Sequence, residues 1–168
     1  MSIILNRLDS RLAHGTVCNT WVPGMGATGI IVVDDVKCKD PFLVKLHEKA
    51  APQGVSMATI STDEMAERFQ SNQLENGRII VLFGDIDTAL RAYEKGYTYP
   101  ELQIANITMP PGKSKKVIVA KGVAMDREEG ERLRKLQDEH QVKIFFQCFP
   151  PDPRRTLNDV LAKAKFKK

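Results

Sequence analysis

The stretch Gly29-Ile30-Ile31-Val32-Val33-Asp34-Asp35 decides the fold class of this chain. Four consecutive β-branched residues without a polar interruption are typical of a strand that is buried on both of its faces. Strands of that kind occur in parallel sheets whose two faces are covered by helices. Residues 77–85 repeat the pattern, with an apolar run that ends in Gly84 and Asp85. The two runs therefore predict an α/β fold with a mostly parallel sheet.

Strand-like and helix-like segments alternate outward from these runs over the whole chain. No shift of composition, internal repeat or low-complexity linker divides them. We therefore predict a single doubly wound domain over residues 1–168, with a mostly parallel central sheet flanked by helices on both faces and with right-handed crossovers. The further expected strands are residues 3–5, 55–60, 102–107, 117–120 and 142–146, and the expected helices are residues 16–22, 41–50, 61 onward, 85–93, 127–140 and 156–166.

Two of the expected helices carry further predictions. The first, residues 16–22, is expected to end at Pro23-Gly24, with Trp21 packed in the core near the preceding loop. The second, residues 41–50, has Phe42, Leu46 and Ala50 at helical spacing, which predicts an apolar stripe that faces the core. His47 lies among charged residues of that helix and is interpreted as a surface histidine.

Composition and charge limit the classes of protein to which the chain can belong. Its 42% apolar and 27% charged residues are ordinary for a globular protein, and no apolar run approaches the roughly 20 residues that span a bilayer. The N-terminus lacks the pattern of a signal peptide, so we expect a cytoplasmic protein. Lysine and arginine exceed aspartate and glutamate by 25 − 21, a net charge of +4. Much of the excess lies in residues 113–116 and 163–168, which suits an acidic partner, a membrane face or simple solubility.

The cysteines and glycines of the chain give no signal for a metal or a nucleotide cofactor. Cys18, Cys38 and Cys148 are widely spaced without a CxxC pair, so neither a zinc site nor a disulfide framework is indicated. The string G-M-G-A-T-G at residues 24–29 has the G-x-G-x-x-G spacing, but it leads into an expected strand instead of following one, and no GxxxxGK[ST] motif occurs in the sequence. No dinucleotide or Walker-type site is therefore expected.

A group of chemically matched residues follows the apolar run of residues 3–5 directly. Asp9, Arg11, His14 and Gly15 all lie within residues 6–17, where an open α/β sheet forms its ligand crevice. Imidazole is a nucleophile, and a carboxylate such as Asp9 can orient its ring. A guanidinium such as Arg11 can hold phosphate oxygens through its planar fork, and backbone N–H groups at Gly15 and its neighbour can approach an anion.

Three further aspartates are expected at the same edge of the sheet. Asp34 and Asp35 end the strand that opens this section, and Asp85 follows the strand of residues 79–83. Adjacent carboxylates are metal ligands in some proteins, but without a further clustered ligand they more often make turns and start helices. Their roles stay open at this point, and no metal is predicted.

Residues 7–15, with the sequence R-L-D-S-R-L-A-H-G, resemble the R-I-D-D-R-L-I-H-G-Q-V opening of the mannose/fructose/sorbose-type IIB components of the bacterial sugar phosphotransferase system (PTS). Residues 30–35 resemble the second strand of that family, I-V-V-D-D. Residues 40–42 and 50–55 resemble its D-P-F and A-A-P-x-G-V segments, and the likeness covers essentially the full chain. Departures occur at Ser10, Ala13 and Thr16, and at residues 108–111 after Asn106-Ile107, but they spare Asp9, Arg11 and His14.

The resemblance implies a cytoplasmic phosphocarrier enzyme, a protein-Npi-phosphohistidine–sugar phosphotransferase. His14 would form the phosphohistidine, Arg11 would stabilise the phosphoryl group, Asp9 would orient the imidazole, and Gly15 and Thr16 would supply the backbone of the phosphate loop. The implied partners are a IIA donor, membrane components IIC and IID and a sugar, with peripheral attachment to the inner face of the cell membrane and no nucleic acid. No cofactor is implied beyond the covalent phosphoryl group. The sugar, of the mannose, fructose, sorbose or N-acetylgalactosamine class, is not identified, and a homodimer is left open.

Two alternatives remain beside this hypothesis. Other IIB families carry the phosphoryl group on a cysteine, and Cys18 is the nearest candidate, although it falls inside an expected helix. The second alternative, from another class of protein, is a non-catalytic binding module whose basic loop and tail contact RNA or a regulatory partner. No RNA-reading motif supports it, because aromatic residues do not alternate with the lysines.

Overall fold

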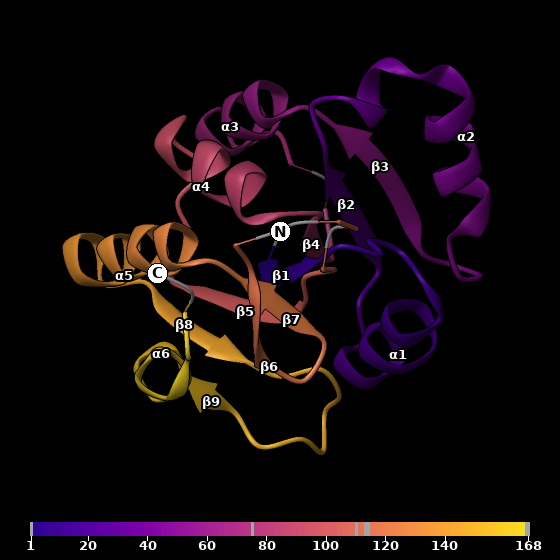
Figure 1. The fold of residues 1–168 in the computed structure, drawn as a ribbon. Helices are drawn as coiled ribbons and strands as arrows, with labels where there is room; N and C mark the ends of the chain where they lie inside the picture. Colours follow the sequence, from indigo (N-terminus) through magenta and orange to yellow (C-terminus); the bar gives the residue numbers. More distant parts are fainter. Residues whose placement is uncertain (1, 75, 110, 113–114, 167–168) are drawn as a thin grey trace.

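A seven-stranded sheet forms the centre of the computed structural model, which describes all residues except 1, 75, 110, 113, 114, 167 and 168 (Figure 1). Its strand order is β3-β2-β4-β1-β5-β8-β9, and all neighbours are parallel except β8 and β9. The predicted α/β fold with a mostly parallel sheet is thereby confirmed. The strands are β1 (Ser2–Asp9), β2 (Gly29–Val33), β3 (Ser56–Ile60), β4 (Arg78–Phe83), β5 (Glu101–Asn106), β8 (Lys143–Phe146) and β9 (Arg155–Thr156).

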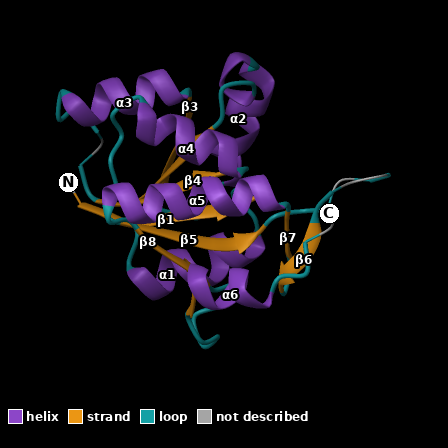
Figure 2. Cartoon of the chain, turned by 60° about the vertical axis from the view of Figure 1, so that its left-hand side comes forward, coloured by secondary structure: helices purple, strands orange, loops and turns teal. Residues whose placement is uncertain are grey.

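Helices cover both faces of this sheet, as predicted. Figure 2 shows α3, α4 and α5 on one side of the strands and α1 on the other. Residues of β2 point alternately to the two sides: Ile31 and Val33 pack with the first group, whereas Ile30 and Val32 pack against the segment that contains α1. The helical elements are η1 (Val17–Trp21, a π-helix), α1 (Val22–Met25), η2 (Lys37–Lys39), α2 (Pro41–Ala50), α3 (Thr62–Gln70), α4 (Ile86–Glu94), α5 (Arg127–His140) and α6 (Leu157–Lys163). Within the described residues, no helix combines the length and apolarity needed to cross a membrane.

Polar residues at the helix starts act as the N-caps that their sequence context predicts. Ser61, Asp85 and Asp126 accept hydrogen bonds from the backbone N–H groups of the first turns of α3, α4 and α5. Asp126 and Glu129 form a complete capping box, in which each side chain bonds to the backbone of the other residue. These caps set the points where the chain turns from the sheet into its covering helices.

Several element boundaries differ from the prediction, most of all those of the first strand and the first helix, and two strands were missed. Strand β1 continues to Asp9, whereas the sequence suggested a strand of residues 3–5, because buried partners satisfy the polar side chains of its second half. The first helical segment runs through Pro23 and ends at Gly26, which has a left-handed φ of 59°; a proline is tolerated there because it lies in the first turn of α1. The prediction also missed β9 and β7 (Val123–Met125), which pairs with β6 (Val117–Ala120) in an antiparallel hairpin.

Helix α2 does not present the buried stripe that its spacing suggested. Phe42 and Leu46 are 72% and 50% exposed, and none of the residues of α2 is buried. Helix α2 lies beside β3, an edge strand, so little of the sheet lies beneath it (Figure 1). His47 is not the free surface histidine that we expected: its Nδ1 is 2.8 Å from Oγ1 of Thr59 in β3, and burial lowers its pKa.

The order of the strands creates a crevice at the carboxyl ends of β1 and β4. These neighbours are followed by helices on opposite faces, since β1 leads to η1 and α1 and β4 leads to α4. Such a topological switch point is where doubly wound sheets bind ligands. The loop after β1 enters this crevice, and Leu12, with a left-handed φ of 54°, packs close to Gly84 after β4. The loop that carries Arg11 and His14 therefore lies at the carboxyl end of β1, as predicted.

Candidate functional site

Asp9 is the centre of the candidate site. As the last residue of β1, it is fully buried, and each of its carboxylate oxygens accepts hydrogen bonds from basic groups. Oδ2 lies 3.0 Å from His14 Nε2 and 3.0 Å from Arg7 Nη2. Oδ1 accepts from the backbone N–H of Arg11 at 3.2 Å and from its Nε at 3.3 Å. The structure thus brings together the three side chains that the sequence suggested, and it adds Arg7.

The surroundings of Asp9 favour its ionised form. Burial is the largest single effect and would raise the pKa of the carboxyl. The hydrogen bond from His14, the charge of Arg7 and the backbone N–H of Arg11 together outweigh burial, so the pKa of Asp9 is lowered. A carboxylate held in this way is a permanent acceptor for the imidazole N–H.

His14 is held at both ring nitrogens, and its side chain is 18% exposed. Nε2 faces the carboxylate of Asp9, and Nδ1 lies 3.3 Å from the backbone nitrogen of Thr16. A backbone N–H only donates, so Nδ1 accepts and the ring proton belongs on Nε2, toward Asp9. In this tautomer Nδ1 carries the lone pair of the ring.

The loop backbone contributes through Thr16 more clearly than through Gly15. Thr16 supplies the N–H that points at Nδ1. Gly15 does not adopt a left-handed conformation, and a Cβ built there would meet nothing closer than the amide nitrogen of Asn19 at 3.7 Å. Its lack of a side chain is therefore not a requirement of the loop itself.

The side chain of Arg11 has hydrogen-bond donors that the described residues do not use. Its side chain is 45% exposed and touches Asp9 only through Nε. Among the described residues, neither of its terminal nitrogens has a hydrogen-bond partner. These two nitrogens form the planar fork that suits a phosphoryl or carboxylate group.

Arg7 was missed as a site residue by the reasoning from sequence. Its side chain is fully buried in the middle of the molecule. Nη1 donates to Gln103 Oε1 at 2.5 Å, and Nη2 donates to the carbonyl of Cys148 at 3.2 Å as well as to Asp9. The available signal was the spacing of Arg7 and Asp9, since residues two apart share one face of a strand.

The ring of Trp21 packs against the guanidinium of Arg7. Its centroid is 5.2 Å from the guanidinium carbon, and its indole N–H donates to the same carbonyl of Cys148 at 3.1 Å. Trp21 is 6% exposed, which confirms that it packs in the core near the His14 loop. Burial lowers the pKa of Arg7, while the charge of Asp9 opposes that effect.

The three further aspartates stabilise loops and helix starts. Asp34 accepts from two backbone N–H groups of the following turn and pairs with Lys37 at 2.5 Å. Asp35 accepts from the backbone N–H of Thr62 at 2.7 Å and pairs with Arg91 at 2.6 Å. Asp85 caps α4. In the part of the chain that the structure describes, no group of three metal-ligating side chains occurs.

The predicted basic loop is described only in part, because residues 113 and 114 lie outside the described residues. Lys116 of that loop forms an ion pair with Glu129 of α5 at 2.5 Å. At the neighbouring strand end, Ser10 Oγ donates to Asn106 Oδ1 at 2.6 Å and lies 2.7 Å from Thr108 Oγ1. Ser10 thus links the His14 loop to β5.

Comparison with known proteins identifies the family of the chain. Residues 3–168 match the family described as PTS system sorbose subfamily IIB component. The chain is 26% identical over 166 residues to the sorbose-specific EIIB component of Klebsiella pneumoniae, with 99% of both chains covered. It is 25% identical over 163 residues to the mannose-specific EIIAB component of Escherichia coli K12, covering 97% of this chain and 49% of that relative.

A solved structure gives the same assignment. The crystal structure of manxB from Thermoanaerobacter tengcongensis superimposes with a TM-score of 0.87 at 25% identity, over 98% of this chain and 97% of the other. The fold is therefore shared over nearly the full length of both chains. The chain belongs to the sorbose subfamily of IIB components of the sugar phosphotransferase system.

Proposed function

We propose that this protein is a cytoplasmic phosphocarrier that accepts a phosphoryl group on Nδ1 of His14 and passes it to a sugar. The observation that carries the proposal is the 3.0 Å contact between His14 Nε2 and Asp9 Oδ2, which keeps the ring proton on Nε2. The lone pair of Nδ1 attacks the phosphorus atom of a phosphohistidine on a IIA component. The N–P bond on the donor breaks as the new N–P bond forms, and the donor nitrogen keeps the electron pair.

The side chains of the site have separate roles in this transfer. Phosphoryl transfer needs mainly positioning and stabilisation of charge on the transferred oxygens. The uncommitted fork of Arg11 binds two of these oxygens. The N–H of Thr16, which donates to Nδ1 before the reaction, turns to a phosphoryl oxygen once Nδ1 carries phosphorus. Asp9 and Arg7 stay in place and hold the ring.

The proposed partners follow from the family and from the names of relatives. A IIA component donates the phosphoryl group; the mannose-specific relative from E. coli, whose name joins IIA and IIB, supports this pairing. Membrane components IIC and IID bind the carrier at the inner face of the membrane and present the sugar. Relatives named for sorbose, mannose, fructose and N-acetylgalactosamine support that class of substrate. No metal or cofactor is needed at the carrier.

Phosphorylation of the purified protein tests the proposal. The wild type is incubated with phosphoenolpyruvate, the general phosphocarrier proteins and a mannose-class IIA component. We expect acid-labile label on the wild type and none on His14→Ala. His140→Ala, on the surface of α5, is the matched control and keeps the label. The proposal is wrong if His14→Ala is labelled as strongly as the wild type while the IIA component is phosphorylated.

Two further variants separate the mechanism from its alternatives. Cys18 is half-buried, and burial raises the pKa of its thiol, which disfavours the thiolate nucleophile. Cys18→Ser therefore keeps its label. Arg11→Lys loses the fork and is labelled at least about tenfold more slowly, the scale of one charge-assisted hydrogen bond. Phosphorus–nitrogen coupling in the NMR spectrum locates the label, and coupling to Nε2 instead of Nδ1 would contradict the assigned tautomer.

A further inference from the structure

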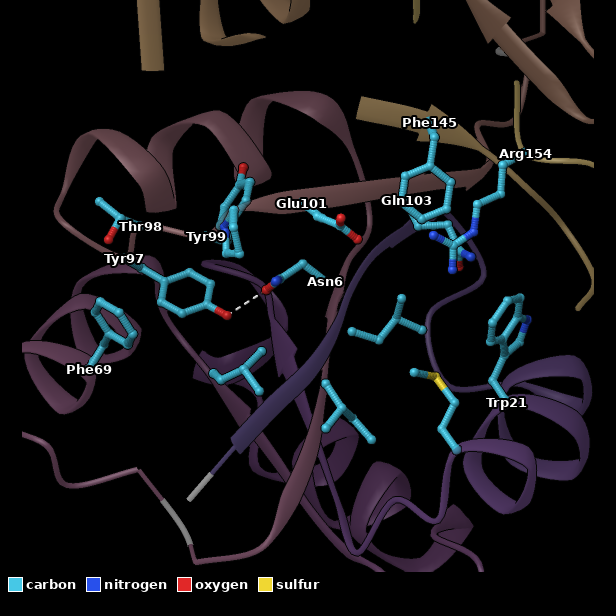
Figure 3. A pocket seen from close by; sticks show the side chains of 15 residues that line it. Asn6, Trp21, Phe69, Tyr97, Thr98, Tyr99, Glu101, Gln103, Phe145 and Arg154 are labelled. Carbon is cyan, nitrogen blue, oxygen red and sulfur yellow. Dashed lines mark hydrogen bonds between the residues drawn. The ribbon is translucent and has the colours of Figure 1, made fainter. Parts of the chain in front are cut away.

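A cavity of about 410 Å³ lies along the first half of β1, whereas Asp9 ends that strand (Figure 3). The first half of β1 and the residues that lead into β5 form its long walls. Its volume falls in the range of pockets that enclose small molecules, about 300 to 1,000 Å³. The residues used in the argument below are Ile4, Asn6, Trp21, Gln103, Phe145 and Arg154.

The cavity exists because β1 and β5 separate at this end. They pair from Arg7 and Gln103 onward, but not along the first half of β1. Pro100, immediately before β5, has no N–H with which to extend the pairing. On its other side β1 carries an extra residue between Ile3 and Leu5 relative to β4, and such a bulge redirects the neighbouring side chains.

At one end of the cavity the aromatic rings of Trp21 and Phe145 lie near the guanidinium of Arg154. Figure 3 shows Trp21, Phe145 and Arg154 around this end, whereas Phe69 and Tyr97 line the other. The guanidinium carbon of Arg154 lies 4.5 Å from the ring centroid of Phe145. Within the described residues Arg154 forms no ion pair, while Glu101 at the same mouth is 3.6 Å from Lys143. Of these two charged lining residues, Arg154 is therefore the one without an ion-pair partner among the described residues.

Two polar side chains of the lining, Asn6 and Gln103, already form hydrogen bonds within the protein. The side-chain oxygen Oδ1 of Asn6 accepts a hydrogen bond from Tyr97 Oη at 2.5 Å. Gln103 accepts from Arg7 at 2.5 Å and donates to Gln147 at 3.2 Å. An occupant thus meets largely apolar walls and one cation without an ion-pair partner, Arg154, which favours an apolar body with one anionic end.

We propose that this cavity binds a small carboxylic acid with an aromatic or branched apolar body, its carboxylate on Arg154 and its body between Trp21 and Phe145. Two side chains, those of Arg7 and Asp9, connect the lining of this cavity to His14. Trp21 and Gln103 both line the cavity and both hold Arg7, which in turn holds Asp9. Binding in the cavity therefore affects the environment of His14 through Arg7 and Asp9, and it does not cover the imidazole.

The single tryptophan of the chain is Trp21, so its fluorescence reports directly on the cavity. The probe is 4-phenylbutyrate, and the uncharged control ligand is 4-phenyl-1-butanol. We expect a saturable change of Trp21 fluorescence with the carboxylate, and binding at least tenfold weaker with the alcohol. A flat titration of the wild type with 4-phenylbutyrate up to about 10 mM, or equal affinity for the two ligands, overturns the proposal.

Variants decide whether the cavity is the site. Arg154→Gln removes the cation and is expected to weaken carboxylate binding about tenfold, whereas Arg134→Gln, an exposed arginine on α5, keeps wild-type affinity. Ile4→Phe fills the cavity and is expected to abolish binding, with far-ultraviolet circular dichroism as the check that it folds. Unchanged affinity in Arg154→Gln or in folded Ile4→Phe overturns the proposal.

The coupling to the phosphorylation site is measured by NMR on the same samples. We expect the imidazole resonances of His14 to shift on binding, while those of His140 do not. Unshifted His14 resonances at saturation contradict the coupling. None of these measurements uses a phosphoryl donor, so their failure is distinct from failure of the proposed phosphocarrier function.

Discussion

Nη2 of Arg7 lies 3.0 Å from Oδ2 of Asp9, and neither side chain has any exposed surface. The same carboxylate oxygen is 3.0 Å from the imidazole of His14. The residue that orients the imidazole is therefore itself held by a cation that solvent cannot reach. Much of the behaviour of the site follows from this buried pair.

Removal of Arg7 should destabilise the whole domain. Arg7→Met leaves Asp9 buried with only Arg11 and His14 as partners, and breaking a buried pair costs about 3–5 kcal/mol. We expect the free energy of unfolding, measured with urea, to fall by that amount. Arg132→Met breaks the exposed ion pair with Asp87 and should cost less than about 1 kcal/mol. Equal decreases in the free energy of unfolding of the two variants would show that burial does not increase the contribution of the Arg7–Asp9 pair.

The response of stability to acid should depend on Asp9. The pKa of Asp9 is lowered in the folded protein, so its stabilising effect is complete above the unfolded pKa of about 3.9 and is lost as the pH falls through the folded value. In the wild type, we expect the free energy of unfolding to drop more steeply below about pH 4 than in Asp9→Asn. Urea titrations between pH 6 and 2 measure both slopes, and parallel curves would contradict the lowered pKa.

Trp21 should contribute to stability through its N–H as well as its ring. Trp21→Phe leaves the carbonyl of Cys148 without the indole donor and removes the larger ring from Arg7. Loss of a buried hydrogen-bond partner costs about 1–3 kcal/mol. Urea unfolding followed by circular dichroism measures the effect, and a change below about 0.5 kcal/mol would mean that the cavity and its surroundings relax to compensate.

Helix α2 should tolerate loss of its largest apolar side chain. Phe42 is 72% exposed, so Phe42→Ala is expected to change the free energy of unfolding by less than about 0.5 kcal/mol. Phe83, fully buried at the end of β4, is the matched comparison, and Phe83→Ala should cost about 3–5 kcal/mol. A large loss for Phe42→Ala would indicate that α2 packs on another surface in solution.

Patterns within single segments were enough to predict most of the architecture. Continuous β-branched runs marked β2 and β4, and capping residues such as Ser61 and Asp126 marked the helix starts. The close grouping of Asp9, Arg11 and His14 was also predictable, because all three lie within six residues at one strand end. Each of these patterns depends only on residues that are close together in the sequence, so it can be recognised without knowledge of the fold.

The features that were missed depend on partners far away in the chain. Arg7 has the appearance of a surface residue until Gln103 and Cys148 surround it, and those residues are separated from it by 96 and 141 positions. The end of β1 was misplaced for the same reason. The stripe on α2 was wrong because spacing alone does not reveal that the sheet ends beneath it at β3. Short pairings such as β8 with β9 leave too few residues for a recognisable pattern.

The distant support of Arg7 has a consequence for how the protein is made. The residues of the site leave the ribosome before Cys148, whose carbonyl is added about 140 residues later. A nascent or truncated chain can therefore carry the entire His14 motif while Arg7 still lacks the contacts that fix Asp9. Arg7 and Asp9 therefore reach the arrangement described above only after the segment around Cys148 has been synthesised.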